Sequence, residues 1–276
     1  MNAAEQLIAL GVEDVQGTGD ERGVRIDEVG IDELSYPIGV EARDGTIQQT
    51  VAEAAMTVEL AHDLRGVHMS RFVEVLDAHA GAIGPAGFRA MAAETRSRLE
   101  SERSRVSLQF PYFLSRRAPA SEKASMVRYE CRLVGESSPR ATSVEVGVRV
   151  PVTSLCPCSK EISDYGAHNQ RGHIEIAVTS PWSDGTASGI WFEDLIEIAE
   201  AAASAPVYPL LKRSDERHVT MQAYDNPAFV EDIVRDVVVA LREDVRVARA
   251  RVRARNQESI HDHSAVAQLR WERTGG

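Results

Sequence analysis

The chain has 276 residues, of which 43% are hydrophobic and 26% are charged, the balance of a protein that buries a core in water. Its formal net charge of −11 argues against a general nucleic-acid binder, because such proteins neutralise phosphates with a basic surface. No uncharged apolar run approaches the roughly 20 residues that span a bilayer, and the N-terminal residues lack the pattern of a signal peptide. Three cysteines are too few for a disulfide framework. We therefore predict a cytoplasmic protein without nucleic-acid or membrane partners.

The first half of the chain predicts strands around a pair of helices. Residues 1–27 are rich in Gly, Asp, Glu and Arg without periodicity, so we expect a weakly ordered arm. Extended patterning predicts strands, and capping signals predict helices, one with Ser70 as its N-cap and one opened by Pro85. The strands are expected at 29–40, 46–60, 105–114 and 126–134, and the helices at 70–79 and 85–100.

The second half repeats this order. Valines at every second position from Val144 to Val152 give the clearest strand signal in the chain. Further strands are expected at 173–178, 245–255 and 265–271, and helices at 191–203 and 227–241. This order predicts an α+β protein of two ββααββ modules, at 28–138 and 139–276. Because each module leaves unpaired strand edges, we expect the modules to pair with each other and with other subunits into a barrel.

Residues 151–172 combine two thiols, an imidazole and two cations between strand-like runs. Cys156 and His168 lie on one connection, and thiolate and imidazole are ligands that zinc and ferrous iron accept. The cysteine count excludes a four-cysteine zinc site, so further ligands must be His, Asp or Glu. A buried thiol and a surface histidine are the ordinary alternative, which the pair alone does not exclude. We interpret the segment as half of a metal site.

Two polar segments are candidates for the other half. His261 and His263 are two residues apart after an extended run, so on a strand they would face the same side, which favours function over two surface histidines. Residues 210–218 form a charge cluster after Pro206 and Pro209, which we interpret as the start of a loop. This cluster is either a solvated face, or it supplies an oxygen ligand and a phosphate contact. The candidates for these roles are Asp215 or Glu216, and Lys212 or Arg213.

Two groups of basic residues have a role that the sequence does not decide. Arg249, Arg251, Arg253 and Arg255 alternate with small or apolar residues, so they line one face of a strand that is either a solvated outer face or the lumen of a barrel. Arg65, His68 and Arg71 cluster at a predicted helix N-terminus, which attracts anions. Neither a GxxxxGK[ST] phosphate loop nor a GxGxxG fingerprint is present in the sequence.

Five ordered segments together resemble the GTP cyclohydrolase I type IB family. They are GVHMSRF at 66–72, PVTSLCPCSKEISDYGAHNQRG at 151–172, VYPLLKRSDER at 207–217, YDNPAFVEDIVRD at 224–236 and NQESIHDH at 256–263. The resemblance implies a tunnelling fold of two tandem ββααββ modules, assembled into a homotetramer with active sites between subunits. It also implies hydrolysis of GTP to 7,8-dihydroneopterin triphosphate and formate, the entry step of folate and related pterin synthesis.

The resemblance also implies roles for single residues. The metal ligands would be Cys156, His168, Glu216 and His261, holding one manganese, iron or zinc ion that activates water for attack on C8 of guanine. Cys158 and His263 are the candidates for proton transfer. A carboxylate should anchor the guanine N–H groups, with Glu231 as first choice and Glu258 as second. The candidate triphosphate contacts are Lys160, Arg171, Lys212, Arg213, His68 and Arg71.

Two alternatives stay open. A nitrile reductase of the same fold would use NADPH and a cysteine nucleophile without a metal, which the two-histidine segment disfavours. A metal-stabilised oligomer that binds a purine or pterin without turnover is the non-catalytic alternative.

Overall fold

The structure, a computed structural model, describes residues 15–180 and 189–274. Residues 1–14, about half of the predicted N-terminal arm, therefore lie outside the described residues. The last part of the arm is described, and Gly19 there forms a bridge with Leu64. No helix in the described ranges is long and apolar enough to cross a membrane.

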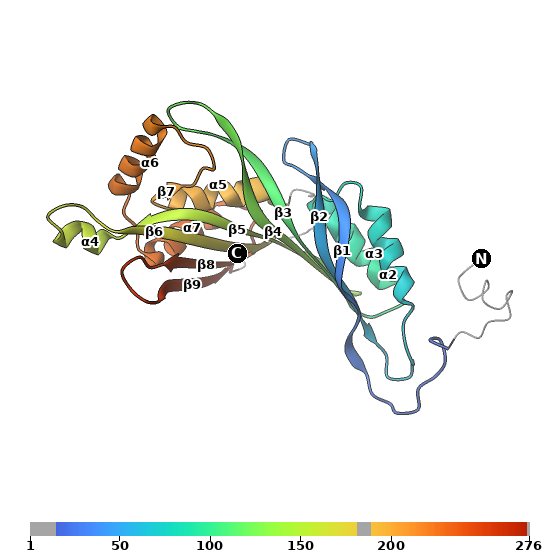
Figure 1. The fold of residues 1–276 in the computed structure, drawn as a ribbon. Helices are drawn as coiled ribbons and strands as arrows, with labels where there is room; N and C mark the ends of the chain where they lie inside the picture. Colours follow the sequence, from blue (N-terminus) through green and yellow to red (C-terminus); the bar gives the residue numbers. More distant parts are fainter. Residues whose placement is uncertain (1–14, 181–188, 275–276) are drawn as a thin grey trace.

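A single antiparallel sheet, in the order β1-β2-β3-β4-β5-β6-β8-β9, runs through the molecule (Figure 1). Its strands are β1 (Ile26–Glu41), β2 (Ile47–Leu60), β3 (Ser104–Arg117), β4 (Ala124–Ser137), β5 (Thr142–Leu155), β6 (Asn169–Thr179), β8 (Arg249–Gln257) and β9 (Ser264–Glu272). A two-residue strand, β7 (Ala205–Pro206), pairs with β5 where the β3–β4 hairpin has bent away. The α+β class and the antiparallel sheet are confirmed.

Four long helices match the predicted ones: α2 (Met69–His79), α3 (Pro85–Arg98), α5 (Phe192–Ala202) and α7 (Val230–Glu243). Helix α3 packs against β3, β4 and β5, α5 packs against β5 and α7, and α7 covers β8 and β9. The buried residues of both helix pairs and of the sheet form one continuous hydrophobic cluster. The core is therefore shared by the two halves of the chain.

The structure corrects three local predictions. Ser70 is not the cap of α2, because His68 occupies the N-cap with extended backbone (φ −80°, ψ 102°), so Ser70 is already helical. The charge cluster begins in the loop expected after Pro209, but from Arg213 onward it forms the start of helix α6 (Arg213–Asp225). The connection after Cys156 contains a short helix, α4 (Pro157–Ile162). Helix α6 escaped prediction because it has few buried positions and therefore lacks a clear apolar stripe.

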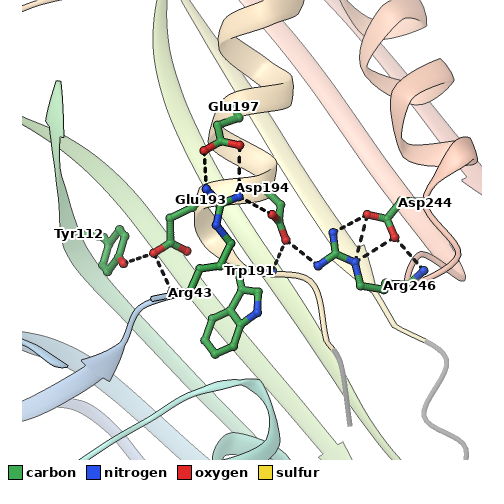
Figure 2. Close-up of polar contacts among 8 residues, drawn as sticks. All are labelled: Arg43, Tyr112, Trp191, Glu193, Asp194, Glu197, Asp244 and Arg246. Atoms are coloured by element: carbon green, nitrogen blue, oxygen red, sulfur yellow. Dashed lines mark hydrogen bonds and ion pairs between the residues drawn. The ribbon is translucent and has the colours of Figure 1, made fainter. Parts of the chain in front are cut away.

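A polar junction joins the turn after β1 to helix α5 of the second half (Figure 2). Glu193 is only 7% exposed, and its Oε1 accepts hydrogen bonds from the hydroxyl of Tyr112 at 2.6 Å and from the backbone N–H of Arg43 at 3.1 Å. Burial, together with the nearby Glu193 carboxylate, raises the pKa of the Tyr112 phenol well above its usual value. The Arg43 guanidinium also pairs with Asp194 and Glu197, each at 2.8 Å. The halves are thus tied by charge as well as by the core.

Gly135 of β4 marks the closest approach of helix α3 to the sheet. A Cβ at this position would lie 2.8 Å from the Cβ of Ala92 and 3.2 Å from a ring carbon of Phe88. Gly147 on the neighbouring strand β5 is a matched case, because its Cβ would meet nothing nearer than 3.6 Å. The first glycine is required by packing and the second is not.

We expect Gly135→Ala to lower the free energy of unfolding by about 1–3 kcal/mol, because the added methyl overpacks the contact with α3. Gly147→Ala should stay within about 1 kcal/mol of the parent protein, since the methyl has room and the strand gains rigidity. Urea unfolding followed by circular dichroism measures both. Equal destabilisation by the two substitutions would contradict this account of the packing.

Candidate active site

Three of the segments singled out in the sequence meet at one end of the sheet. Strand β5 ends at Leu155, next to Cys156, and β6 begins at Asn169, directly after His168. Leu155 and Asn169 are paired across these two strands. On its other side β6 pairs with β8, with Gly172 opposite Asn256, so residues 258–263 leave the sheet at the same end (Figure 1).

Cys156 and His168 close a compact loop. Cys156 is the N-cap of α4, and its Sγ accepts a hydrogen bond from the backbone N–H of Ser159 at 3.4 Å. Its own N–H donates to the carbonyl oxygen of His168 at 3.1 Å. The N–H of His168 in turn donates to the hydroxyl of Ser159 at 3.1 Å. The structure therefore brings Cys156 and His168 together, while Cys158 is exposed on α4.

The His168 ring is oriented through its Nδ1 atom. This nitrogen lies 2.9 Å from Oε1 of Gln170, 3.3 Å from Oγ of Ser259 and 3.9 Å from Oε2 of Glu258. These contacts occupy Nδ1, so Nε2 is the ring nitrogen that would coordinate a metal. Gln170 and Ser259 were missed in the sequence, although Gln170 follows His168 by two residues where the chain enters β6, a spacing that shares one face of an extended chain.

Asp215 is a structural carboxylate. It is fully buried and accepts hydrogen bonds from the N–H groups of Ala120, Ser121 and Lys212 and from the hydroxyl of Ser121, all at 2.7–2.8 Å. These bonds cap α6 and hold the tip of the β3–β4 hairpin against it. Burial acts to raise the pKa of Asp215, but the hydrogen bonds outweigh it and hold the pKa well below its usual range.

Of the two carboxylates open as oxygen ligands, Glu216 is therefore the available one. It is exposed in the first turn of α6, where Oε2 lies 2.6 Å from a guanidinium nitrogen of Arg213. Lys212, the N-cap of that helix, is exposed as well.

The other candidate substrate residues are divided between two regions. Lys160 donates from Nζ to the carbonyl oxygen of Tyr224 at 2.6 Å, which links α4 to the end of α6. Glu231 is exposed at the start of α7, and Arg171 is exposed on β6. The start of α2, with His68 and Arg71, lies at the far end of the sheet (Figure 1). The substrate-binding residues predicted from the sequence therefore do not lie at one site within a single chain.

The predicted metal ligands also do not form a finished cluster within one chain. Across residues 15–180 and 189–274, no group of three or more His, Cys, Asp or Glu side chains is placed to hold a metal ion. His261 and His263 are exposed and stack on each other, with ring centroids 5.2 Å apart. The ligand roles of Cys156, His168, Glu216 and His261 stay predictions.

The arginines of β8 lie on the face of the sheet that the helices leave uncovered. Arg251 lies 4.0 Å from a carboxylate oxygen of Glu145, and Arg253 lies 3.6 Å from one of Glu175. The face is therefore a mixed-charge surface and not a purely basic one, whether it faces solvent or a lumen.

We expect Asp215→Asn to lower the thermal unfolding midpoint at neutral pH, because an amide replaces two of the acceptor positions with a donor. The lowered pKa fixes the sign: the carboxylate stabilises the folded state above its ordinary pKa of about 4, and this contribution declines as pH falls further. The difference between parent and variant midpoints should be constant from about pH 8 to pH 5 and shrink below about pH 4. A difference that does not change with pH would contradict it.

Comparison with known proteins shows which family the chain matches. The sequence model of the family described as type I GTP cyclohydrolase folE2 matches residues 12–267. GTP cyclohydrolase FolE2 of Nitrosococcus oceani is 46% identical over 273 residues, covering 99% of this chain and 100% of the relative. The protein of that name from Methylococcus capsulatus is 49% identical over 258 residues, 94% of each chain.

Solved structures agree at the level of the fold. Uricase from Arthrobacter globiformis matches with a TM-score of 0.56 at 10% identity over 91% of this chain and 94% of that chain. A uricase from Bacillus fastidious matches with a TM-score of 0.51 at 9% identity over 92% and 94%. These likenesses show a shared architecture, which is consistent with the expected tunnelling fold. The family match and the curated relatives show more: the chain belongs to the type I GTP cyclohydrolase FolE2 family.

Proposed function

We propose that the protein converts GTP and water to 7,8-dihydroneopterin triphosphate and formate, the entry step of folate and pterin synthesis, with one divalent metal ion at each site. Membership of the family across nearly the whole chain carries this proposal. The meeting of the Cys156, His168 and 258–263 segments at one end of the sheet supports it, because it gathers the residues suited to the chemistry. We place the reaction in the cytoplasm.

Cys156, His168, Glu216 and His261 would hold the ion. A thiolate, two imidazoles and a carboxylate suit manganese, ferrous iron or zinc. Because Nδ1 of His168 is in contact with Gln170, Nε2 is the nitrogen that would coordinate the ion. When bound, the ion supplies Lewis acidity that makes water nucleophilic near neutral pH. Glu216 is exposed on α6 and His261 is exposed between β8 and β9, so assembly of the subunits would be needed to bring them to the ion held by Cys156 and His168.

Other side chains would bind the substrate and move protons. Glu258 lies 3.9 Å from His168, and its side chain is only 12% exposed. It therefore belongs to the metal end, by which we mean the end of the sheet that carries Cys156 and His168. This favours the exposed Glu231 as the guanine anchor. Cys158 and His263 give protons to the substrate and take protons from it. These transfers accompany the opening of the imidazole ring of guanine and the loss of its C8 carbon as formate. The triphosphate contacts come from Lys160, Arg171, Lys212, Arg213, His68 and Arg71.

Assembly would complete the site. In this proposal the chain is divided into the two ββααββ modules expected from the sequence, 28–138 and 139–276. The terminal strands of the sheet, β1 and β9, are the edges available for pairing. Pairing of these edges with those of other copies forms a barrel and a homotetramer. The start of α2, which carries His68 and Arg71, is remote from α4 within one chain (Figure 1) and would then reach a site between subunits.

Purified protein supplied with GTP and manganese, iron or zinc should release formate and a fluorescent pterin. Cys156→Ala should abolish turnover and the rise in unfolding temperature that the metal causes, because a ligand is lost. Cys131→Ala is the matched control: this thiol is buried in the core, so its loss affects stability and not the metal response. Consumption of NADPH with a deazaguanine nitrile, or GTP binding without formate release, would point to the alternatives instead.

The guanine anchor is tested on helix α7. We expect Glu231→Gln to raise the KM for GTP by about 10- to 100-fold, since charge-assisted hydrogen bonds to the base are lost. Glu243→Gln, at the other end of the same helix, should leave KM unchanged. If Glu258→Gln raises KM and Glu231→Gln does not, the assignment of the two carboxylates is reversed.

A further inference from the structure

A line of hydrogen bonds crosses three segments beneath the candidate site. The Nδ2 amide of Asn256 donates to Oγ of Ser154 at 2.7 Å, and this hydroxyl donates to the carbonyl oxygen of Ala228 at 3.2 Å. Asn256 is 3% exposed and Ser154 is fully buried. The directions are fixed, because a carbonyl oxygen only accepts and the serine hydroxyl has one hydrogen to give.

A glycine makes room for this line. Asn256 on β8 is paired with Gly172 on β6, and Val152 of β5 is paired with Gly172 from the other side. The asparagine side chain crosses over the glycine to reach β5. A Cβ at Gly172 would lie 2.5 Å from Oδ1 of Asn256, so any larger residue displaces the amide. The line therefore depends on residues from three strands at once.

The line connects the parts of the site that have separate roles. Ser154 precedes Cys156 by two residues, Asn256 precedes Glu258 by two, and Ala228 precedes Glu231 by three. Backbone bonds reinforce the connection, since the N–H of Ala228 donates to the carbonyl oxygen of Leu155 at 3.1 Å. The N–H of Leu155 donates to the buried hydroxyl of Ser204 at 3.0 Å.

We propose that Ser154 and Asn256 are positioning residues that fix the distance between the guanine-binding start of α7 and the Cys156–His168 loop. This inference rests on the proposed function. Without the line, the base still binds to Glu231, but C8 of guanine is no longer held at the reacting distance from the metal end. Misplacement of about 1 Å is enough to cost roughly 100-fold in rate. The effect should therefore fall on kcat and not on GTP affinity.

The direct test compares Ser154→Ala with Ser104→Ala. Ser104 is also buried, at 4% exposure, and donates to the carbonyl oxygen of Ala92 at 2.7 Å in the first half of the chain. Both variants lose one buried hydroxyl and should lose similar thermal stability. Only Ser154→Ala should lower kcat, by about 10- to 100-fold. Its affinity for GTP, measured by calorimetry on metal-free protein, should change less than about 3-fold, because the anchor is intact.

A double-mutant cycle tests the same line from β6. Gly172→Ala should lower kcat like Asn256→Ala, because its methyl displaces the amide. Adding Gly172→Ala to Asn256→Ala should cost little more, since the clashing atom is already gone. This cycle decides the matter if Ser154→Ala does not fold.

The outcomes separate the two proposals. If the parent protein forms pterin from GTP but Ser154→Ala matches Ser104→Ala in kcat, or if the two substitutions of the cycle are additive, the positioning role is wrong and the proposed function stands. If the parent protein forms no pterin with any of the metals, both fail. A kcat loss with unchanged GTP affinity in Ser154→Ala, together with non-additivity in the cycle, supports the positioning role.

Discussion

The register that β6 keeps with its two neighbours, β5 and β8, is the constraint on which the candidate site depends. Because β6 pairs on both sides, the residues that follow β5, precede β6 and follow β8 must emerge together. The crossing of Asn256 over Gly172 admits only one such register, since a shift by a single residue would place a side chain where the amide lies. Backbone pairing thus brings candidate site residues from distant parts of the sequence together, and side-chain contacts then fix their positions.

The acidic residues of this protein divide into those that build it and those left for chemistry. Glu193 joins the halves of the chain, and Asp215 joins the tip of the β3–β4 hairpin to α6. Each carboxylate is buried, and one of its oxygens accepts two hydrogen bonds. Glu216 and Glu231 are exposed in the first turns of α6 and α7, so their carboxylates are accessible to a ligand. Neighbours in sequence such as Asp215 and Glu216 therefore have different roles, which follow from helix geometry: successive residues point about 100° apart.

Much of this could be predicted from the sequence, where the physical signal is local. Period-two valines located β5, and the shared connection between Cys156 and His168 predicted their proximity, which is confirmed. Helix α6 was missed because its stabilisation comes from the cap at Asp215 and not from an apolar stripe. The line through Ser154 was not predictable either, since neither Ser154 nor Asn256 carries a signal until the register of three strands is known. The convergence of Glu216 and His261 on one ion depends on assembly and stays a prediction.

The central claim is that one ion and one guanine meet at this end of the sheet. Crystals grown with zinc and a non-hydrolysable GTP analogue test it most directly, through the anomalous signal of the metal. The account predicts a peak in bonding contact with Cys156 and His168, and the base against the start of α7. A metal peak bound elsewhere, with Cys156 and His168 unliganded in the assembled protein, would contradict it.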